Sequence, residues 1–266
     1  MSEKNISYNS YDLQTEHFIT KNIIYRNAPE KEINLQQISR NDGFVLQNTR
    51  FTQKQITVEG FLSEDSEASL KSTLDAMKAA LSQNEKNLDI DDGGTTMRFV
   101  CSVESINIPE DFYHISDVPY SIKFKCQPFA TSTNSVTSTN TITQSSSSPF
   151  TDSIVTVGSY GPKPKIKILC ADTPATDITQ IVFNNTTTNE SITVLNLVLD
   201  NTGDYLEIDC DEMTVKSSYD GGTATQIDFT GVFPSFIAGT NTYSITITGG
   251  TTFSLTESIV YYPNYI

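Results

Sequence analysis

The stretch QKQITVEGFLSEDSEASLKSTLDAMKAAL, residues 53–81, contains two different hydrophobic periods in succession. In its first part Ile56, Val58 and Gly60 alternate with polar residues, and this period of two predicts a half-buried strand. In its second part the spacing of apolar residues changes to one stripe of a helix. That stripe consists of Leu70, Leu74, Met77 and Leu81. A strand followed by one amphipathic helix is therefore the core of the first half of the chain.

The ends of this helix carry capping signals. Ser63 or Ser66 can cap its start, because a serine side chain accepts a hydrogen bond from a free backbone N–H there. Acidic residues between positions 64 and 67 suit the positive end of the helix dipole, and Lys78 and Lys86 suit the negative end. We therefore expect a helix over about residues 66–84.

Strand-like runs surround this segment on both sides. Alternating or apolar runs occur at residues 17–26, 32–38, 44–47, 96–108 and 120–129. Asn41-Asp42-Gly43 is a strong turn signal between two of these runs, and Asp91-Asp92-Gly93-Gly94 is another after residue 90. The first half is thus predicted to be a β-rich domain with one helix.

The second half shows only the period of two. Ile166 and Ile168 alternate with lysines, and Leu206, Ile208 and Cys210 alternate with acidic residues. Gly-containing turn signals separate many such short runs, as expected for an antiparallel β-sandwich. The fold class is therefore mainly β, with a helix only in the first half.

A segment poor in apolar residues separates the halves. Of the 18 residues at 131–148, 15 are Ser, Thr or Asn, and none is charged. Such a composition favours a linker or an extended crossover, because it offers little apolar surface to offset the cost of ordering. We expect a first domain at 1–130, a Ser/Thr-rich linker at 131–149 and a second domain at 150–266.

Composition and charge argue against several classes of function. The 266-residue chain has 17 basic and 32 acidic residues, a net charge of −15, which opposes binding to nucleic acid phosphates. The amino terminus lacks the apolar core of a secretory signal, and no run is long enough to span a membrane. We expect a soluble protein made in the cytoplasm.

The four cysteines, Cys101, Cys126, Cys170 and Cys210, lie far apart in the sequence. No C-x-x-C pair suggests zinc or a redox motif. In a reducing cytoplasm we expect buried free thiols. A Cys101–Cys126 bridge requires that their two strands pair, and it is the less favoured alternative.

Motifs for catalysis or metal binding are weak in this sequence. No phosphate-binding loop, dinucleotide fingerprint or zinc-protease motif occurs, and neither His17 nor His114 has an evident Ser or Cys partner in the sequence. The densest acidic run alternates with apolar residues and predicts a solvated strand face, with a weak cation site as the alternative. Its candidate ligands are Asp204, Glu207, Asp209 and Asp211. We expect no enzymatic activity and no cofactor.

The ordered series of segments resembles one known family. The series begins with the strands before residue 38, Asp42-Gly43, the strand of Lys54–Phe61 and the helix, and it continues with Leu88–Gly94, Arg98–Val100 and Tyr120–Phe129. In the second half it includes Pro164–Ile168, Gly203–Asp209, Gly231–Pro234 and Ile259–Tyr262. Over nearly its whole length the chain resembles the distal tail proteins, often called Dit, of phages with long non-contractile tails. Gln127 stands before Pro128-Phe129 where many relatives have Asp.

This resemblance implies a role that composition and spacing do not reveal. Distal tail proteins form a hexameric ring at the tail tip, whose tail-tube-like first domain lines the DNA channel and whose galectin-like second domain points outward. The ring joins the major tail protein to the tail-tip or tail-associated protein, and the outer domains of many phages carry receptor-binding proteins. The implied location is the virion tail tip, after assembly in the host cytoplasm. An acidic chain suits a channel through which DNA must slide.

Two other functions are weighed against this one. A carbohydrate-binding or adhesion sandwich without catalysis would need exposed aromatic rings, for which Tyr261, Tyr262 and Tyr265 are the candidates. The absence of Trp speaks against it. A wall-degrading hydrolase would need two catalytic carboxylates, and the sequence offers no credible pair.

Overall fold

The computed structural model describes residues 4–37, 44–109, 118–143 and 149–266. The chain divides into two compact units, one of residues 1–133 with 265–266 and one of residues 134–264. Each unit buries its own hydrophobic cluster. Both are built from antiparallel β-sheets, so the predicted mainly β fold class is confirmed. Within the described ranges, no helix has the length and apolar character that crossing a bilayer requires.

The first unit is built on one antiparallel sheet with the strand order β2-β1-β7-β8-β9-β6-β3. Its strands are β1 (Ile6–Tyr8), β2 (Tyr11–Asp12), β3 (Phe18–Ile24), β6 (Lys54–Leu62), β7 (Lys86–Asp91), β8 (Thr96–Asn107) and β9 (Val118–Cys126). Two short strands, β10 (Ala130–Ser132) and β22 (Asn264–Tyr265), join the sheet off this path. β7, β8 and β9 follow one another in the sheet as they do in the sequence, whereas β6 lies beside β9 and not beside β7.

The core of the first unit lies on one face of this sheet. Ile56 and Val58 of β6 are fully buried, as the alternation predicts, and they pair in register with Phe124 and Ile122 of β9. The ring of Tyr8 packs 5.3 Å from that of Phe124 although their strands are not neighbours in the sheet. The sheet is thus curled around its own apolar side chains.

The predicted helix is present as α1 (Glu67–Leu81). Ser66 caps it, because its Oγ accepts a hydrogen bond from the backbone N–H of Ser69 at 3.1 Å. Met77 and Leu81 are buried in the core of the unit, and Leu70 and Leu74 pack against it partly buried. The placement of Lys86 at the helix end was wrong. It is the first residue of β7, since the helix already ends at Leu81.

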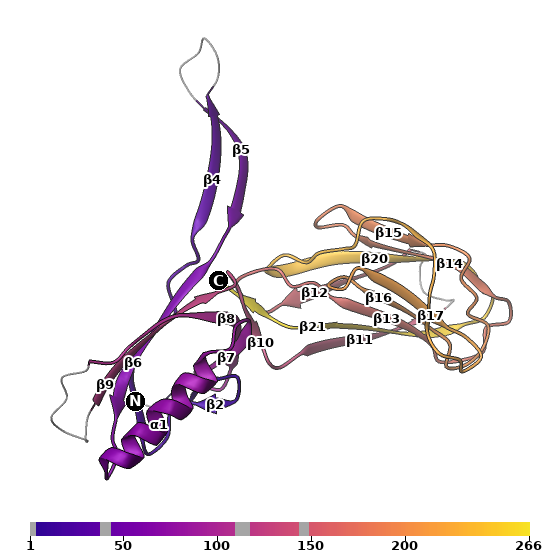
Figure 1. Ribbon diagram of the computed structural model, residues 1–266. Helices are drawn as coiled ribbons and strands as arrows, with labels where there is room; N and C mark the ends of the chain where they lie inside the picture. The colour runs from indigo at the N-terminus through magenta and orange to yellow at the C-terminus, as the bar shows by residue number, and fades with distance from the viewer. Residues whose placement is uncertain (1–3, 38–43, 110–117, 144–148) are drawn as a thin grey trace. The chain divides into compact units, whose positions relative to one another are not determined.

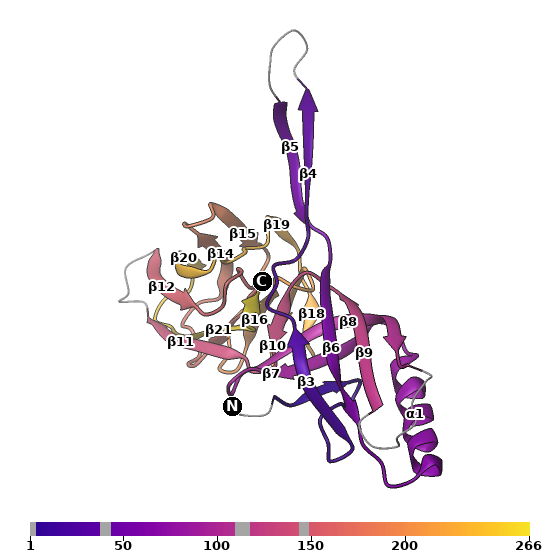
Figure 2. The same cartoon turned by 90° about the vertical axis from the view of Figure 1, so that its left-hand side faces the viewer.

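Two strands of the first unit stand apart from its main sheet. β4 (Lys31–Gln37) and β5 (Phe44–Phe51) pair only with each other, as a two-stranded antiparallel sheet. Figures 1 and 2 show this ribbon running away from the body of its unit. The predicted turn at Asn41-Asp42-Gly43 lies outside the described residues.

The second unit is a sandwich of two antiparallel sheets. The six-stranded sheet has the order β11-β21-β13-β16-β17-β18, and the five-stranded sheet has the order β12-β20-β14-β15-β19. The first comprises β11 (Val136–Thr143), β13 (Lys165–Cys170), β16 (Tyr205–Asp209), β17 (Thr214–Ser218), β18 (Thr225–Gln226) and β21 (Ser254–Tyr261). The second comprises β12 (Phe150–Thr156), β14 (Ile178–Asn185), β15 (Glu190–Val194), β19 (Phe229–Gly231) and β20 (Gly239–Gly249).

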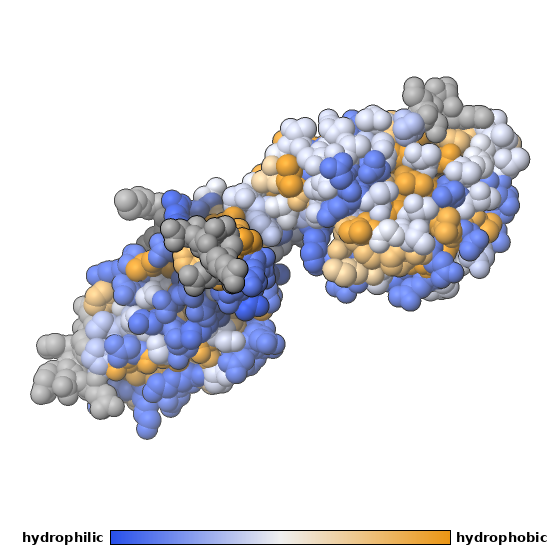
Figure 3. Space-filling model, turned by 90° about the horizontal axis from the view of Figure 1, so that it is seen from above, coloured by the Kyte–Doolittle hydropathy of each residue, from blue (hydrophilic) through white to orange (hydrophobic). Residues whose placement is uncertain are grey.

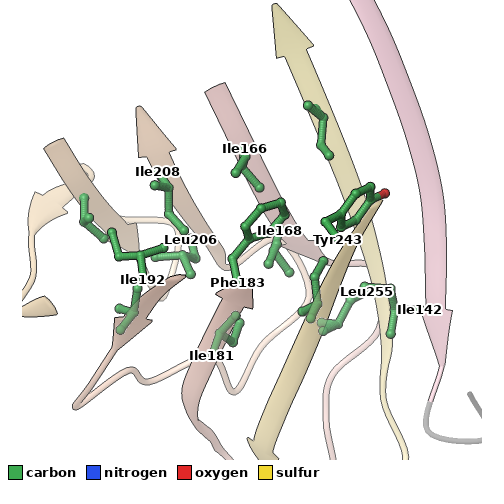
Figure 4. Packing of buried hydrophobic residues seen from close by; sticks show 14 of the residues in the cluster. Ile142, Ile166, Ile168, Ile181, Phe183, Ile192, Leu206, Ile208, Tyr243 and Leu255 are labelled. Carbon is green, nitrogen blue, oxygen red and sulfur yellow. The ribbon is translucent and has the colours of Figure 1, made fainter. Parts of the chain in front are cut away.

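Apolar side chains from both sheets fill the space inside the sandwich (Figure 4). Ile166 and Ile168 of β13 and Leu206 of β16 are fully buried, as their alternation with charged residues predicts. The rings of Phe183 and Tyr243 stack 5.2 Å apart on neighbouring strands of the five-stranded sheet. The second half of the chain is therefore a β-sandwich.

Much of the described part of the expected linker at 131–149 forms strands. Residues 136–143 form β11, which pairs along its full length with β21 at the edge of the six-stranded sheet. Ile142 is buried in the sandwich core, while the neighbouring Thr side chains remain more exposed. Thr is a good strand former even without much apolar surface. Buried Ile142 and partly buried Val136 attach this edge strand to the core. The two units therefore meet along the chain at residues 133–134 without a long connector.

Candidate functional site

The β4–β5 ribbon, called the arm below, has one apolar and one polar face. Along β4, Ile33 and Leu35 alternate with Asn34 and Gln36, and Leu35 pairs directly with Leu46 of β5. Directly paired residues of antiparallel strands share a face. The apolar face therefore carries four large side chains that are 55% to 65% exposed: Ile33, Leu35, Phe44 and Leu46.

The other face of the arm is held by polar contacts between the two strands. Arg50 Nε donates to Glu32 Oε2 at 2.6 Å, and Gln47 Nε2 donates to Gln36 Oε1 at 2.6 Å. Val45 is the exposed apolar exception on this side. An isolated two-stranded hairpin is at best marginally stable in water. The apolar face is thus a surface that gains stability once another surface covers it.

The base of the arm is fixed to the first unit. Glu30 N–H donates to Gln53 O at 2.8 Å, and Thr52 N–H donates to Glu30 O at 2.9 Å. The ring of Phe51 packs edge-on against that of Phe129, 5.4 Å away. These contacts close the ribbon just where β5 leads into β6.

The main sheet of the first unit has a second face that is polar. We call it the polar sheet face. It consists of Gln55, Thr57, Glu59, Glu104, Ser121, Lys123 and Lys125. Lys125 Nζ lies 3.0 Å from Glu104 Oε1, and Gln55 Nε2 donates to Glu104 Oε2 at 2.9 Å. These two hydrogen bonds lower the pKa of Glu104, and the one from Lys125 has the larger effect. The acidity of the chain is therefore not concentrated on this face, whose lysines offset its carboxylates.

A partly exposed ionic cluster ties the start of the chain to the predicted turn after β7. The turn is confirmed, because Asp92 N–H donates to Thr95 O at 2.9 Å and Gly94 N–H donates to Asp91 Oδ1 at 3.1 Å. Lys4 Nζ lies 2.8 Å and Arg26 Nη2 2.9 Å from Asp92 Oδ1. The hydrogen bond from Lys4, with those involving Tyr25 and Arg26, lowers the pKa of Asp92 to about 2.

The outward face of the five-stranded sheet, called the neutral sheet face, bears no ionisable side chain among its described residues. It consists of Thr151, Ser153, Val155, Gln180, Val182, Asn184, Ser191, Thr193, Thr230, Thr240, Thr242, Ser244, Thr246 and Thr248. In Figure 3 much of the surface of the second unit is pale, the shade of intermediate hydropathy, whereas the first unit is mostly blue. This face lacks the charge of the other sheet, and Val155, 66% exposed, is its one strongly exposed apolar side chain among the described residues.

The acidic residues proposed as weak cation ligands make other contacts. Asp204 is buried, and its carboxylate accepts hydrogen bonds from the backbone N–H groups of Asn201 and Asp220, at 2.9 and 2.8 Å. Lys165 Nζ lies 2.8 Å from Asp209 and 3.8 Å from Glu207. Asp211 lies 3.3 Å from Lys163. Asp209 is only 8% exposed, so the expected fully solvated acidic face is wrong for this residue, which burial against Lys165 removes from water.

Other candidate groups are dispersed. Where the structure describes the chain, no three His, Cys, Asp or Glu side chains gather in a group that could hold a metal ion. His17 Nδ1 lies 3.5 Å from Glu64 Oε2, and His114 lies outside the described residues. Of the aromatic candidates for a sugar platform, Tyr261 is buried, because its side chain points into the sandwich, whereas Tyr262 is exposed. The proposed aromatic cluster is therefore incomplete.

A second deeply buried carboxylate of the sandwich, beside that of Asp204, belongs to Glu257. Its Oε2 accepts hydrogen bonds from the Tyr243 hydroxyl at 2.9 Å and from Asn140 Nδ2 at 3.0 Å. Burial raises its pKa, and the charge of Asp152 acts in the same direction. These contacts join β11, β20 and β21, so the group links the two sheets of the sandwich.

The four cysteines fall into two classes. Cys101 of β8 and Cys126 of β9 form a disulfide, with their Cα atoms 4.0 Å apart, whereas Cys170 and Cys210 are free and buried. The preference for four free thiols was therefore wrong for the first pair. Their strands are neighbours and place the two residues directly opposite each other. Burial raises the pKa of Cys170 to about 11 and that of Cys210 to about 12.

One known family matches most of the first unit. Residues 6–126 match the family described as the phage tail protein RIFT-related domain. These residues include the arm, the polar sheet face and α1. No curated protein matches the chain.

Solved structures extend the likeness to both units. The chain is similar to the Dit protein (gp 19.1) of phage SPP1, described as a paradigm of the hub adsorption apparatus in phages that infect Gram-positive bacteria, with a TM-score of 0.71, 15% identity and 99% of each chain covered. It also matches a chain of the phage P2 baseplate in its activated, calcium-containing conformation, with a TM-score of 0.48, 11% identity and 98% and 97% of the two chains covered. The resemblance to distal tail proteins is thereby confirmed.

Proposed function

We propose that this chain, a structural phage tail protein with the distal tail fold, closes with five further copies of itself into a ring that links the tail tube to the tail tip. The observation that carries the proposal is the arm. Its four large apolar side chains are more than half exposed in the single chain. A second copy is the partner that covers them.

A closed ring is the assembly in which every arm finds the same partner surface. Contact between an arm and a different patch on the next copy is heterologous, and such contacts close into a ring when the rotation between copies allows it. Closure also gives the outer strand β3 of the main sheet a neighbour, and an exposed strand edge is otherwise prone to uncontrolled pairing. Ile19 and Ile24 of β3 are 40% and 41% exposed, which adds apolar surface to this edge.

The polar sheet face is proposed to line the channel through the ring. A channel wall for DNA needs polar side chains and no surplus of positive charge, because clustered lysines would bind the phosphates. Lys125 is matched by Glu104, and Asn22 Nδ2 donates to Glu59 at 3.3 Å on the same side of the sheet. The face therefore suits passage of DNA without sequence-specific binding.

The partners of the ring follow from the resemblance. One side of the ring is proposed to meet the major tail protein and the other the tail-tip or tail-associated protein, with assembly in the host cytoplasm. The galectin-like sandwich is proposed to point outward and to hold a receptor-binding protein. This role makes and breaks no covalent bond.

The ring proposal is tested by measuring the mass of the purified full-length chain in solution and imaging it by negative stain. The wild type is expected to form six-fold particles with a central hole. The double variant Leu35→Glu/Leu46→Glu is expected to be monomeric, because two carboxylates on the apolar face would be buried without partners. Thr246→Glu on the neutral sheet face is the matched control and is expected to keep the ring. A monomeric wild type at every concentration would refute the proposal.

A further inference from the structure

Four residues form one row across four neighbouring strands of the first unit. Lys54 of β6 is opposite Cys126 of β9, Cys126 is opposite Cys101 of β8, and Cys101 is opposite Lys86 of β7. Side chains directly opposite each other on antiparallel strands lie on one face of the sheet. The two sulfur atoms are therefore flanked by a lysine on each side, on the face that holds the core.

The row is shielded from water at its centre. Cys101 and Cys126 are 2% and 5% exposed, and Lys54 is 3% exposed. The ammonium of Lys54 lies 5.3 Å from the centre of the Phe99 ring and has no carboxylate partner in the part of the chain that the structure describes. Burial lowers the pKa of Lys54. A buried cation without a counter-ion favours an anion beside it, and a thiolate is the group available.

The free cysteines of the second unit have the opposite surroundings. The charges that act on Cys170 come from Asp204 and Asp200, and the first of those acting on Cys210 comes from Asp209. The two thiols lie at opposite ends of the β13–β16 pair. Burial and these carboxylates both disfavour a thiolate at Cys170 and Cys210, and the location of the two residues at opposite ends of the strand pair keeps them from bonding to each other.

We propose that Cys101 and Cys126 are a site of oxidation by a peroxide, at which the lysine-flanked thiol pair is converted to the disulfide after the chain leaves a reducing cytoplasm. The Cys126 thiolate attacks one peroxide oxygen, the O–O bond breaks, and a sulfenic acid and hydroxide form. The Cys101 thiolate then attacks the Cys126 sulfur, the S–O bond breaks, and hydroxide leaves. The hydroxide ions take up the two thiol protons. Two thiols thus lose two electrons, and hydrogen peroxide is reduced to two waters.

A small oxidant is required because the sulfur atoms are buried. Hydrogen peroxide can enter where a tripeptide disulfide such as oxidised glutathione cannot. The Tyr8 hydroxyl of β1 donates to Gln83 O at 2.5 Å and lies 3.2 Å from the backbone oxygen of Cys101, next to this row. The apolar residues Met77 and Leu81 of α1 belong to the same buried cluster.

The Cys101–Cys126 disulfide lies where it strengthens the base of the arm. Cys126 is the last residue of β9, and Lys54, opposite to it, is the first residue of β6 after the arm. Gln127 N–H donates to Val100 O at 2.9 Å directly beyond the bond. Oxidation therefore fixes the strands from which both the arm and the second unit leave, whether or not the ring has formed.

The proposal is tested on the full-length chain, purified reduced and exposed to hydrogen peroxide at neutral pH. Free thiols are expected to fall from four to two, with a mass loss of about 2 Da, and peptide mapping is expected to place the bond at Cys101–Cys126. Oxidation is expected to raise Tm by about 10 °C in the wild type and not in Cys101→Ser. Oxidised glutathione is expected to react far more slowly than hydrogen peroxide.

The role of the lysines is tested separately. Lys54→Met and Lys86→Met are expected to slow disulfide formation about tenfold each, because the thiolate loses a stabilising cation. The control Lys123→Met, on the polar sheet face, is expected to leave the rate unchanged. Equal rates in all three variants, loss of all four thiols at the same rate, or oxidation to sulfonic acid without a disulfide would each overturn the proposal.

Discussion

The arm and the neutral sheet face are both exposed β surfaces, and they differ in what they expose. The arm presents Phe44 and Leu46 at 65% and 58% exposure, with no core beneath them. The neutral sheet face presents Thr and Ser over a well-packed sandwich. A surface that already covers a core can remain hydrated at no cost, whereas the arm gains stability only by contact with another molecule. The comparison indicates that self-association depends on the arm.

Removing the arm is expected to have the largest effect. Lys31 and Phe51 are register partners at its base, so residues 32–50 can be replaced by a two-glycine turn without moving β6. The shortened chain is expected to fold. Its association constant with other copies is expected to fall more than 100-fold, so that no rings form. Mass in solution and circular dichroism measure the two effects. Rings of normal size from the shortened chain would assign association to another surface.

Buried and exposed phenylalanines are expected to differ in their effect on folding. Phe183→Ala in the sandwich core should lower the free energy of unfolding by about 3–5 kcal/mol, because it leaves a cavity. Phe44→Ala on the arm should change the free energy of unfolding of the dissociated chain by less than about 0.5 kcal/mol, because the phenyl ring of Phe44 has no packing to lose. Urea unfolding of both variants measures the difference. A comparable loss in Phe44→Ala would show that the arm packs within its own chain.

A smaller effect is expected at Asp92, whose contacts are internal to the first unit. Its folded-state pKa of about 2 lies below the unfolded value, so its stabilisation is present above about pH 4 and is lost as the pH falls towards 2. Asp92→Asn should cost about 1–2 kcal/mol at neutral pH and little near pH 2. Unfolding measured across this pH range checks the prediction. An equal cost at both ends of the range would contradict the ionic explanation.

The smallest effect is expected on the neutral sheet face. Thr246→Glu should change the free energy of unfolding by no more than about 0.5 kcal/mol, because the side chain points to solvent. Its ring should have the same mass as that of the wild type. If this variant failed to form the ring, self-association would depend on the neutral sheet face as well as on the arm, which would contradict the comparison.

Local patterns in the sequence predict most of the elements. The alternation of Ile56 and Val58 and the stripe ending at Leu81 both have the burial they predict. The low hydrophobicity of residues 136–143 predicts a linker, but the segment is an edge strand, which needs few apolar anchors such as Ile142. Their partner strand, β21, lies more than 100 residues away, and no local pattern reveals that pairing.

Assembly features depend on register, which a single sequence does not reveal. The pairing of Cys101 with Cys126 requires β8 and β9 to align at one position. The alternation at Ile33 and Leu35 predicts a strand with an apolar face, but not that this face leaves its own core. The arm could have been suspected from that alternation alone, whereas its exposure needs the strand order of the whole unit.

The central claim is that copies of this chain associate through the arm, and the mass of the wild-type particle beside that of Leu35→Glu/Leu46→Glu tests it most directly. The account predicts a wild-type particle of six times the 29.4 kDa chain mass and a variant at the mass of one chain. Two species of identical mass, whether both single chains or both rings, would contradict it.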